Sequence, residues 1–159
     1  MNLQEVREAT AEAARAAEEL AAHLERLSGR MSVLLPVDPA DLSRWSDDPW
    51  KRLHALLRMF EQLYDLTSRK LFRGFLFLSG ETIAGLSAQN QFRRMEALGA
   101  IGSADRWIEI GATRNMLVHD YPTDGPARAQ RANRAWRDLP DLIAATQRTI
   151  TVLRSETLI

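Results

Sequence analysis

Apolar side chains recur at every third or fourth position along most of this chain, the spacing that one face of an α-helix requires. Residues 2–27 show it first, with leucine, valine and alanine separated by Glu and Arg, and Gly29 is the expected stop. A second helix is expected to begin at residues 47–49, where two aspartates precede a proline, and to continue to about Leu71. Both segments are predicted to bury one face.

Glycines interrupt the helical pattern in the middle of the chain. The apolar stretch from Phe72 to Leu78 contains Gly74, which predicts a kink or the end of the second helix there. A third helix is expected from about residue 81 to Leu98, because Gly99 then occupies the position where a glycine commonly ends a helix.

The last third of the chain predicts two more helices. Ser103 is a favourable cap for a helix that Pro122 then stops. A final long helix is expected over residues 127–153, with Pro140 kinking or splitting it near Leu139. Five helical segments, no strand pattern and mostly short connections predict an all-α, up-and-down helical bundle of about five helices, forming a single domain over residues 1–159.

Residues 30–48 form the only long stretch without helical periodicity. Pro36 and Pro39 interrupt it, and Trp45 is expected to anchor it to the bundle. Residues 31–35 fit either a short extended piece or a loop packed on the helices. The segment also has the length to cover part of a site, but no pattern in it selects that role.

Composition narrows the class of protein. The hydrophobic share of 45% and the charged share of 26% are typical of a soluble globular domain. The absence of cysteine excludes disulfides, Cys-ligated zinc and thiol nucleophiles. The first eight residues carry charges where a signal peptide needs an apolar core, and no apolar run approaches the ~20 residues of a membrane-spanning helix. A cytoplasmic protein without a membrane partner is therefore expected.

The formal net charge is zero, so any nucleic-acid site must be a local patch rather than a property of the whole surface. All of the 21 Lys and Arg residues except Lys51 and Lys70 are arginines. A genome that favours Arg codons explains this simply. Selection for the forked guanidinium, which matches phosphate geometry, is the other explanation, and both stay open.

Candidate chemistry is concentrated in the octet of residues 114–121. Arg114 is a permanent cation whose forked donors fit a phosphate. His119 titrates in the range where it can give or take a proton near neutral pH. Asn115 and Tyr121 add neutral hydrogen-bonding groups. The octet thus combines a phosphate clamp with a proton-transfer group and requires no metal.

Helical geometry separates the two key groups of the octet. At roughly 100° per residue, Arg114 and His119 lie about 140° apart around the helix axis. One helix therefore does not present both groups to a single phosphate. The octet shares its arc with the apolar Trp107 and Ile108, so we expect it to be partly buried against another helix or another subunit. Two copies related by a twofold axis would form a shared cleft, which predicts a homodimer.

The pattern Arg114-x4-His119-x-Tyr121, with Asn115 directly after the arginine, resembles the HEPN superfamily. More narrowly, it is similar to the HepT-type toxins of bacterial HEPN–nucleotidyltransferase toxin–antitoxin pairs. The run of residues 92–101 that leads into the capped helix fits as well. The resemblance covers about residues 91–122, is only architectural elsewhere, and leaves residues 30–48 unmatched.

This resemblance implies a metal-independent endoribonuclease that works as a dimer. His119 would be the general acid or base at the attacking 2′-hydroxyl, and Arg114 would stabilise charge on the scissile phosphate. Asn115 would orient the histidine or the substrate, and the product would carry a 2′,3′-cyclic phosphate. The nucleotidyltransferase (MNT-type) antitoxin partner would neutralise the toxin by transferring AMP to Tyr121, which blocks the cleft and repels RNA.

Two alternatives accompany this interpretation. In the first, the octet only caps and packs a helix, with His119 and Tyr121 as satisfied core residues. In the second, the chain is a non-catalytic HEPN-like binding or scaffold subunit of a nucleotidyltransferase complex. No glycine-rich phosphate loop, no metal-spaced His, Asp and Glu set and no nucleophile elbow supports other chemistry, so no cofactor or metal is expected.

A row of arginines follows the octet at a spacing of three: Arg128, Arg131, Arg134 and Arg137. This spacing keeps them on one slowly drifting face of the last helix. The row is either a solvated face or a track for the RNA backbone, which would start one turn after Tyr121.

Overall fold

A computed structural model describes residues 2–119 and 121–159, and in this part of the chain every regular element is a helix. The expected all-α bundle is confirmed. The elements are α1 (Leu3–Met31), α2 (Pro39–Ser43), α3 (Asp47–Leu66), the π-helical η1 (Thr67–Phe72), α4 (Arg73–Leu78), α5 (Ala88–Ala97), α6 (Ala104–His119) and α7 (Gly125–Ser155).

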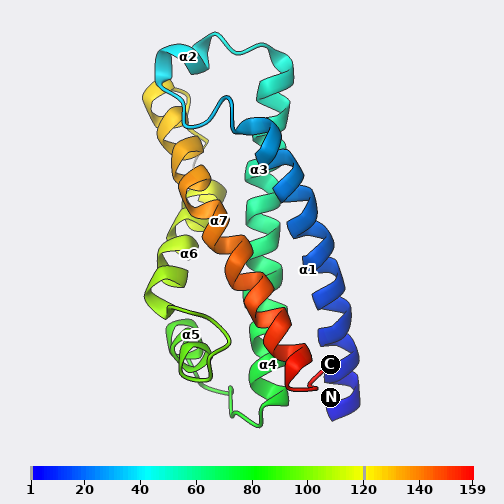
Figure 1. Cartoon of the computed structure of the whole chain (residues 1–159). Helices are drawn as coiled ribbons and strands as arrows, with labels where there is room; N and C mark the ends of the chain where they lie inside the picture. The colour runs from blue at the N-terminus through cyan, green and yellow to red at the C-terminus, as the bar shows by residue number, and fades with distance from the viewer. Residues whose placement is uncertain (1, 120) are drawn as a thin grey trace.

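The long helices run alternately up and down (Figure 1). α1 ascends from the end where both chain termini lie, α3 with η1 and α4 descends, α6 ascends and α7 descends, while α5 is seen nearly end-on and so lies across the bundle (Figure 1). The link between α6 and α7 lies near α2, at the end opposite the chain termini. Within the described residues, no helix has both the length and the apolar character needed to cross a membrane.

Aromatic side chains from three helices form the core beneath α6. Trp107 is buried, stacks on Tyr64 with ring centroids 4.8 Å apart, and lies 4.8 Å from the ring of Phe72. Phe92 of α5 completes the cluster at 6.4 Å from Trp107. Because α6 contributes the central side chain, burial of this apolar area fixes α6 against both α3 and α5.

The first helix is longer than predicted. It continues to Met31, and Gly29 lies inside it rather than ending it. Met31 is completely buried, so its contribution to the core outweighs the cost of about 1 kcal/mol that a glycine imposes within a helix.

The third helix begins later than predicted. Residues 79–87 are irregular, and α5 starts only at Ala88, where the Ser87 hydroxyl accepts a hydrogen bond from the Asn90 N–H. Gly80 and Gly85 both have φ of +81°, a left-handed conformation that interrupts a right-handed helix and favours glycine. Gly99, at φ +78°, ends α5 as expected.

The helical backbone runs without a break from α3 through η1 to α4, so the second predicted helix ends at Leu78 and not at Gly74. Gly74 serves a different purpose from the predicted kink. A Cβ at this position would lie 2.2 Å from the side-chain oxygen of Thr10, so glycine allows α1 and α4 to approach closely.

α7 continues through Pro140 as one 31-residue helix, so of the two predicted effects of this proline the split near Leu139 is wrong. Buried side chains on both sides of the proline, including Leu139 and Leu142, pack both halves against the core.

The segment of residues 30–48 is ordered and packed. It contains the short α2, which the sequence did not predict, and Trp45 packs partly buried against the core as expected. The side chain of Asn133 on α7 donates to the carbonyl of Val37 at 2.7 Å and accepts from its N–H at 2.8 Å. These bonds fasten the segment to the first half of α7, beside the link that follows α6.

Candidate functional site

The octet lies at the C-terminal end of α6. Arg114, Asn115 and His119 occupy its last two turns, and His119 is its final residue. Tyr121 lies in the link to α7 with 66% of its surface exposed. Asp120, also part of the octet, lies outside the described residues.

Arg114 is held by a carboxylate that the sequence analysis did not identify. Two nitrogens of its guanidinium lie 2.9 Å from the two carboxylate oxygens of Asp65 on α3. The hydrogen bond to Asp65 raises the pKa of Arg114 further above its usual value, and partial burial offsets some of that increase. The arginine is therefore a fixed cation whose fork already has an anionic partner within its own chain.

Tyr64 and Gly111 bring α3 and α6 together next to this pair. A Cβ at position 111 would lie 2.5 Å from the Tyr64 hydroxyl, so only glycine leaves room for the phenol. Burial raises the pKa of Tyr64, and the positive charge of Arg114 opposes that shift. This contact sets the register at which Asp65 reaches Arg114.

His119 and Asn115 are exposed. The Asn115 side-chain oxygen accepts from Arg114 at 3.2 Å, so this amide is turned toward the arginine. Among the described residues no hydrogen bond or ion pair joins His119 to Arg114. The chain by itself thus leaves the proton-transfer group and the phosphate clamp apart, as the helical geometry predicted. The exposure of His119 and Tyr121 contradicts the alternative in which both are satisfied core residues.

Tyr121 is surrounded by aromatic and cationic side chains from α3 and α7. Its hydroxyl lies 3.5 Å from Nε2 of His54, and the two rings meet edge to face at 6.3 Å. The guanidinium of Arg131 lies 5.5 Å from the centre of the Tyr121 ring. On the far side of His54, Trp50 lies under the guanidinium of Arg128 at 5.8 Å.

The arginine row lies against α6 rather than projecting freely into solvent. Arg128 donates to the Pro122 carbonyl at 2.9 Å and Arg131 to the Leu117 carbonyl at 2.6 Å. Arg134 donates to the Thr113 hydroxyl at 2.9 Å. The three side chains are half-buried, so each guanidinium bonds to the protein with some of its N–H groups and exposes others to solvent.

Arg137, the last of the row, is exposed and pairs with Asp138 at 3.0 Å. Arg134 and Arg137 line a shallow hollow of about 650 Å³ between α6 and α7, together with Arg106 and Glu109. Arg106 and Arg137 are paired with carboxylates there, whereas Arg134 bonds to the Thr113 hydroxyl.

Asp138 is a buried anion that ties α7 to α6. Thr113 donates to it by a short hydrogen bond, and Arg106 and Arg137 approach it at 2.9 and 3.0 Å. Burial by itself raises the pKa of Asp138, but the hydrogen bonds from Arg137, Thr113 and Arg106 outweigh it and hold the pKa below its usual value.

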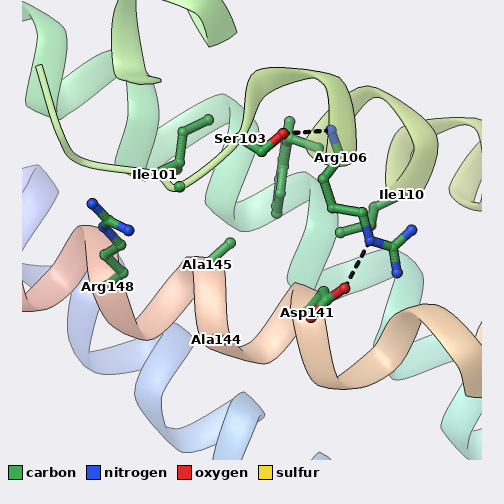
Figure 2. Close-up of a pocket in the computed structure, with 10 residues that line it drawn as sticks. Ile101, Ser103, Arg106, Ile110, Asp141, Ala144, Ala145 and Arg148 are labelled. Carbon is green, nitrogen blue, oxygen red and sulfur yellow. Dashed lines mark hydrogen bonds and ion pairs between the residues drawn. The ribbon is translucent and has the colours of Figure 1, made fainter. Parts of the chain in front are cut away.

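A second hollow, of about 260 Å³, lies at the opposite end of α6 from the octet (Figure 2). Figure 2 shows Arg106 reaching across from α6 to Asp141 of α7, and Ser103 accepting from the Arg106 N–H as the cap of α6. Arg148 lies on the far side and donates to the Gly99 carbonyl. The polar groups of this hollow are thus used in holding α6 to α7.

Sequence reasoning did not identify His54 and Asp65 as neighbours of the octet. A signal was present, because His54, Glu61 and Asp65 are spaced by seven and four residues and so share one face of α3. A polar stripe of this kind indicates a polar neighbour, but it does not say which helix provides it.

Comparison with known proteins returned no match: no family model, no curated protein and no solved structure is similar to this chain. Within the described residues, no group of three or more His, Asp and Glu side chains is arranged to hold a metal ion.

Proposed function

We propose that this chain is a cytoplasmic, metal-independent endoribonuclease of the HEPN type, and that it is the toxin of a toxin–antitoxin pair. Its site is composed of residues from two copies of the chain, and a nucleotidyltransferase antitoxin neutralises it by transferring AMP to Tyr121. The observation that carries the proposal is the exposure of Asn115, His119 and Tyr121 beside a fixed arginine at one end of α6. Side chains kept only for packing would be buried there.

The chemistry follows from the groups present. His119 takes the proton of a ribose 2′-hydroxyl, whose oxygen then attacks the adjacent phosphorus. Arg114 stabilises the negative charge that develops on the phosphate oxygens. The 5′-oxygen of the next nucleotide leaves with a proton, and a 2′,3′-cyclic phosphate remains. Asn115, bonded to Arg114, orients the guanidinium.

Two copies are proposed because one copy separates His119 from Arg114. Val118, an apolar residue between them in sequence, is 46% exposed on the same helix end. Contact with a second α6 would cover Val118 and bring His119 of one copy toward Arg114 of the other.

The pairing of Arg114 with Asp65 favours a second candidate function, a non-catalytic binding or scaffold subunit of a nucleotidyltransferase complex. A guanidinium that already pairs with a carboxylate is less available to a phosphate. In this case the exposed octet would contact the nucleotidyltransferase rather than RNA.

Cleavage of RNA by the purified chain, with EDTA present, tests the proposal. His119→Ala is expected to lower the rate by about 10²–10⁴-fold, the usual contribution of a general acid or base, and the wild-type products are expected to end in 2′,3′-cyclic phosphates. His23→Ala is the matched control, because His23 is an exposed histidine on α1, and its rate is expected to equal that of the wild type. Growth arrest on expression is measured with the same three chains.

Equal cleavage by wild type and His119→Ala would remove His119 from the chemistry. No cleavage and no growth arrest by a wild-type chain that is unmodified at Tyr121 would favour the binding subunit. Purified chain that already carries AMP on Tyr121 would identify the nucleotidyltransferase partnership directly.

A further inference from the structure

The phenol of Tyr121 has a basic neighbour that belongs to a distant part of the chain. Nε2 of His54, 67 residues away in sequence, lies 3.5 Å from the phenol oxygen. The ring of Trp50 packs against His54, with 5.7 Å between the two ring centroids. His54 lies on α3, one of the long helices of the bundle, so the helix fixes its position.

Two cationic side chains from α7 lie close to the phenol of Tyr121. Arg131 lies over the Tyr121 ring and is anchored by its bond to the Leu117 carbonyl. Arg128 from α7 lines the same small hollow as His54, and the described residues that line it include no carboxylate. Among the described residues, Arg128 and Arg131 thus place positive charge near the phenol of Tyr121.

Space for an incoming group exists on the other side of the ring. A hollow of about 360 Å³ is lined by Met116, Tyr121, Pro122, Ala127, Gln130 and Arg131. Its volume lies at the lower end of the range for small-molecule sites. Arg131 lines both hollows, so it can contact the negative charge of a phosphate group that approaches the phenol.

The second tyrosine of the chain provides a contrast. Tyr64 stacks on Trp107 and is half-buried, with its hydroxyl close to Gly111. Burial raises its pKa, which makes it a weaker nucleophile at neutral pH. Both side chains are phenols, so the expected difference in their reactivity comes from their surroundings.

We propose that His54 is the general base for Tyr121, and that it prepares this phenol to accept a nucleoside monophosphate from a nucleoside triphosphate. The class of donor rests on the proposed function, whereas the activation of the phenol rests on the contacts described here. The Tyr121 oxygen forms a bond to the α-phosphorus, the bond from that phosphorus to the bridging oxygen breaks, and pyrophosphate leaves. The phenol proton moves to Nε2 of His54, which must therefore be neutral beforehand, with its proton on Nδ1.

Labelling with 5′-(4-fluorosulfonylbenzoyl)adenosine, an adenosine that carries a tyrosine-reactive sulfonyl fluoride, tests this inference. Mass spectrometry of the two tyrosine peptides gives the rate at each site, with Tyr64 as the internal reference. In the wild type, Tyr121 is expected to react at least about tenfold faster than Tyr64, and its rate is expected to fall in acid, because a protonated imidazole cannot accept the phenol proton.

His54→Ala is expected to slow the labelling of Tyr121 by about tenfold or more at pH 7 and to change its pH profile, because no imidazole is left to accept the phenol proton. His54→Gln, which keeps a hydrogen-bonding group but is not basic, is expected to show the same change in pH profile. A purely structural role for His54 would change neither profile. Unchanged rates and profiles in both variants, or equal labelling of both tyrosines in the wild type, would overturn the proposal.

RNA cleavage by the wild-type chain, measured in parallel, separates this inference from the proposed function. If labelling of Tyr121 depends on His54 but the chain cleaves no RNA, His54 is the base for Tyr121 and the ribonuclease proposal is wrong. If the chain cleaves RNA but labelling does not depend on His54, the ribonuclease proposal holds and the role of His54 is wrong.

Discussion

At the scale of single residues, several ion pairs join one helix to another, among them Arg114–Asp65, Arg106–Asp138 and Arg154–Glu18. Asp138 is the most buried member of these ion pairs, since its side chain has no exposed surface. Its ionic partners lie on α6 and α7. Arg134 extends the same network through Thr113. α6 and α7 are therefore connected by a buried anion, and its removal would take the carboxylate partner from Arg137 and one of three from Arg106.

Replacement of this carboxylate tests the network. Asp138→Asn is expected to lower the free energy of unfolding at pH 7 by about 2–4 kcal/mol, because the amide cannot accept all three donors. Asp141→Asn is the matched control, since Asp141 also bonds to Arg106 but is more than half exposed, and its expected cost is below about 1 kcal/mol. Urea denaturation of the three chains measures both differences.

The pH dependence of the same difference has a definite sign. Asp138 binds its proton less tightly in the folded chain than in the unfolded chain, so the stability that it contributes is complete above the unfolded pKa of about 3.9. That contribution is lost as the pH falls below this value toward the folded pKa. The gap between wild type and Asp138→Asn should therefore shrink in acid, and a gap that stays constant down to pH 3 would contradict the charge network.

At the scale of helices, the candidate site depends on how closely α6 approaches α3. Gly111 permits that approach because the Tyr64 hydroxyl occupies the space of a Cβ. The same approach allows Asp65 to reach Arg114 and His54 to reach Tyr121, so the two pairs at opposite ends of the octet share one helix contact.

A double substitution measures this contact. Gly111→Ala is expected to cost about 1–3 kcal/mol of stability through overpacking, and Tyr64→Phe in the same chain is expected to recover part of that loss, because it removes the atom that lies 2.5 Å away. Gly29→Ala, inside α1 with nothing within 4 Å, is the control and is expected to be neutral or stabilising by up to about 1 kcal/mol. Thermal unfolding of the wild type, of Gly111→Ala and Tyr64→Phe alone and of the double variant gives the coupling, and strictly additive effects would show that Tyr64 and Gly111 do not constrain each other.

The sequence predicts the helices well where local chemistry decides, and less well where packing decides. The cap at Ser103 and the stop at Gly99 are confirmed, because both depend on nearby backbone atoms. The predicted stop at Gly29 and the predicted split at Pro140 are wrong, because the burial of side chains on both sides outweighs the local preference of these residues. The short α2 was missed because its five residues are too few to show periodicity.

The same distinction applies to the candidate site. Helical geometry alone predicts that Arg114 and His119 diverge, and among the described residues no hydrogen bond or ion pair joins them. It does not predict that Arg114 pairs with Asp65 or that Tyr121 contacts His54, because these neighbours depend on the register of α3 against α6. That register is set by Gly111 and Tyr64, whose complementarity becomes visible only in three dimensions.

At the scale of the whole molecule, the ribonuclease proposal requires two copies. Light scattering at micromolar concentration is expected to give twice the 18.0 kDa of one chain. Val118→Glu is expected to shift the protein toward the monomer and to lower RNA cleavage with it, since a carboxylate would be forced into the proposed contact. Val33→Glu is the matched control, because Val33 is 86% exposed in the turn after α1. A wild-type monomer at these concentrations would contradict the composite site.

Both ends of the chain lie at the same pole of the bundle, while the link that carries Tyr121 lies at the other pole (Figure 1). α7 alone separates the two poles by about 45 Å, the length of its 31 residues. An affinity tag, a dye or a surface attachment at either end would therefore stand well clear of the octet. The protein can be immobilised by either end in binding experiments, with its candidate site directed toward the solution.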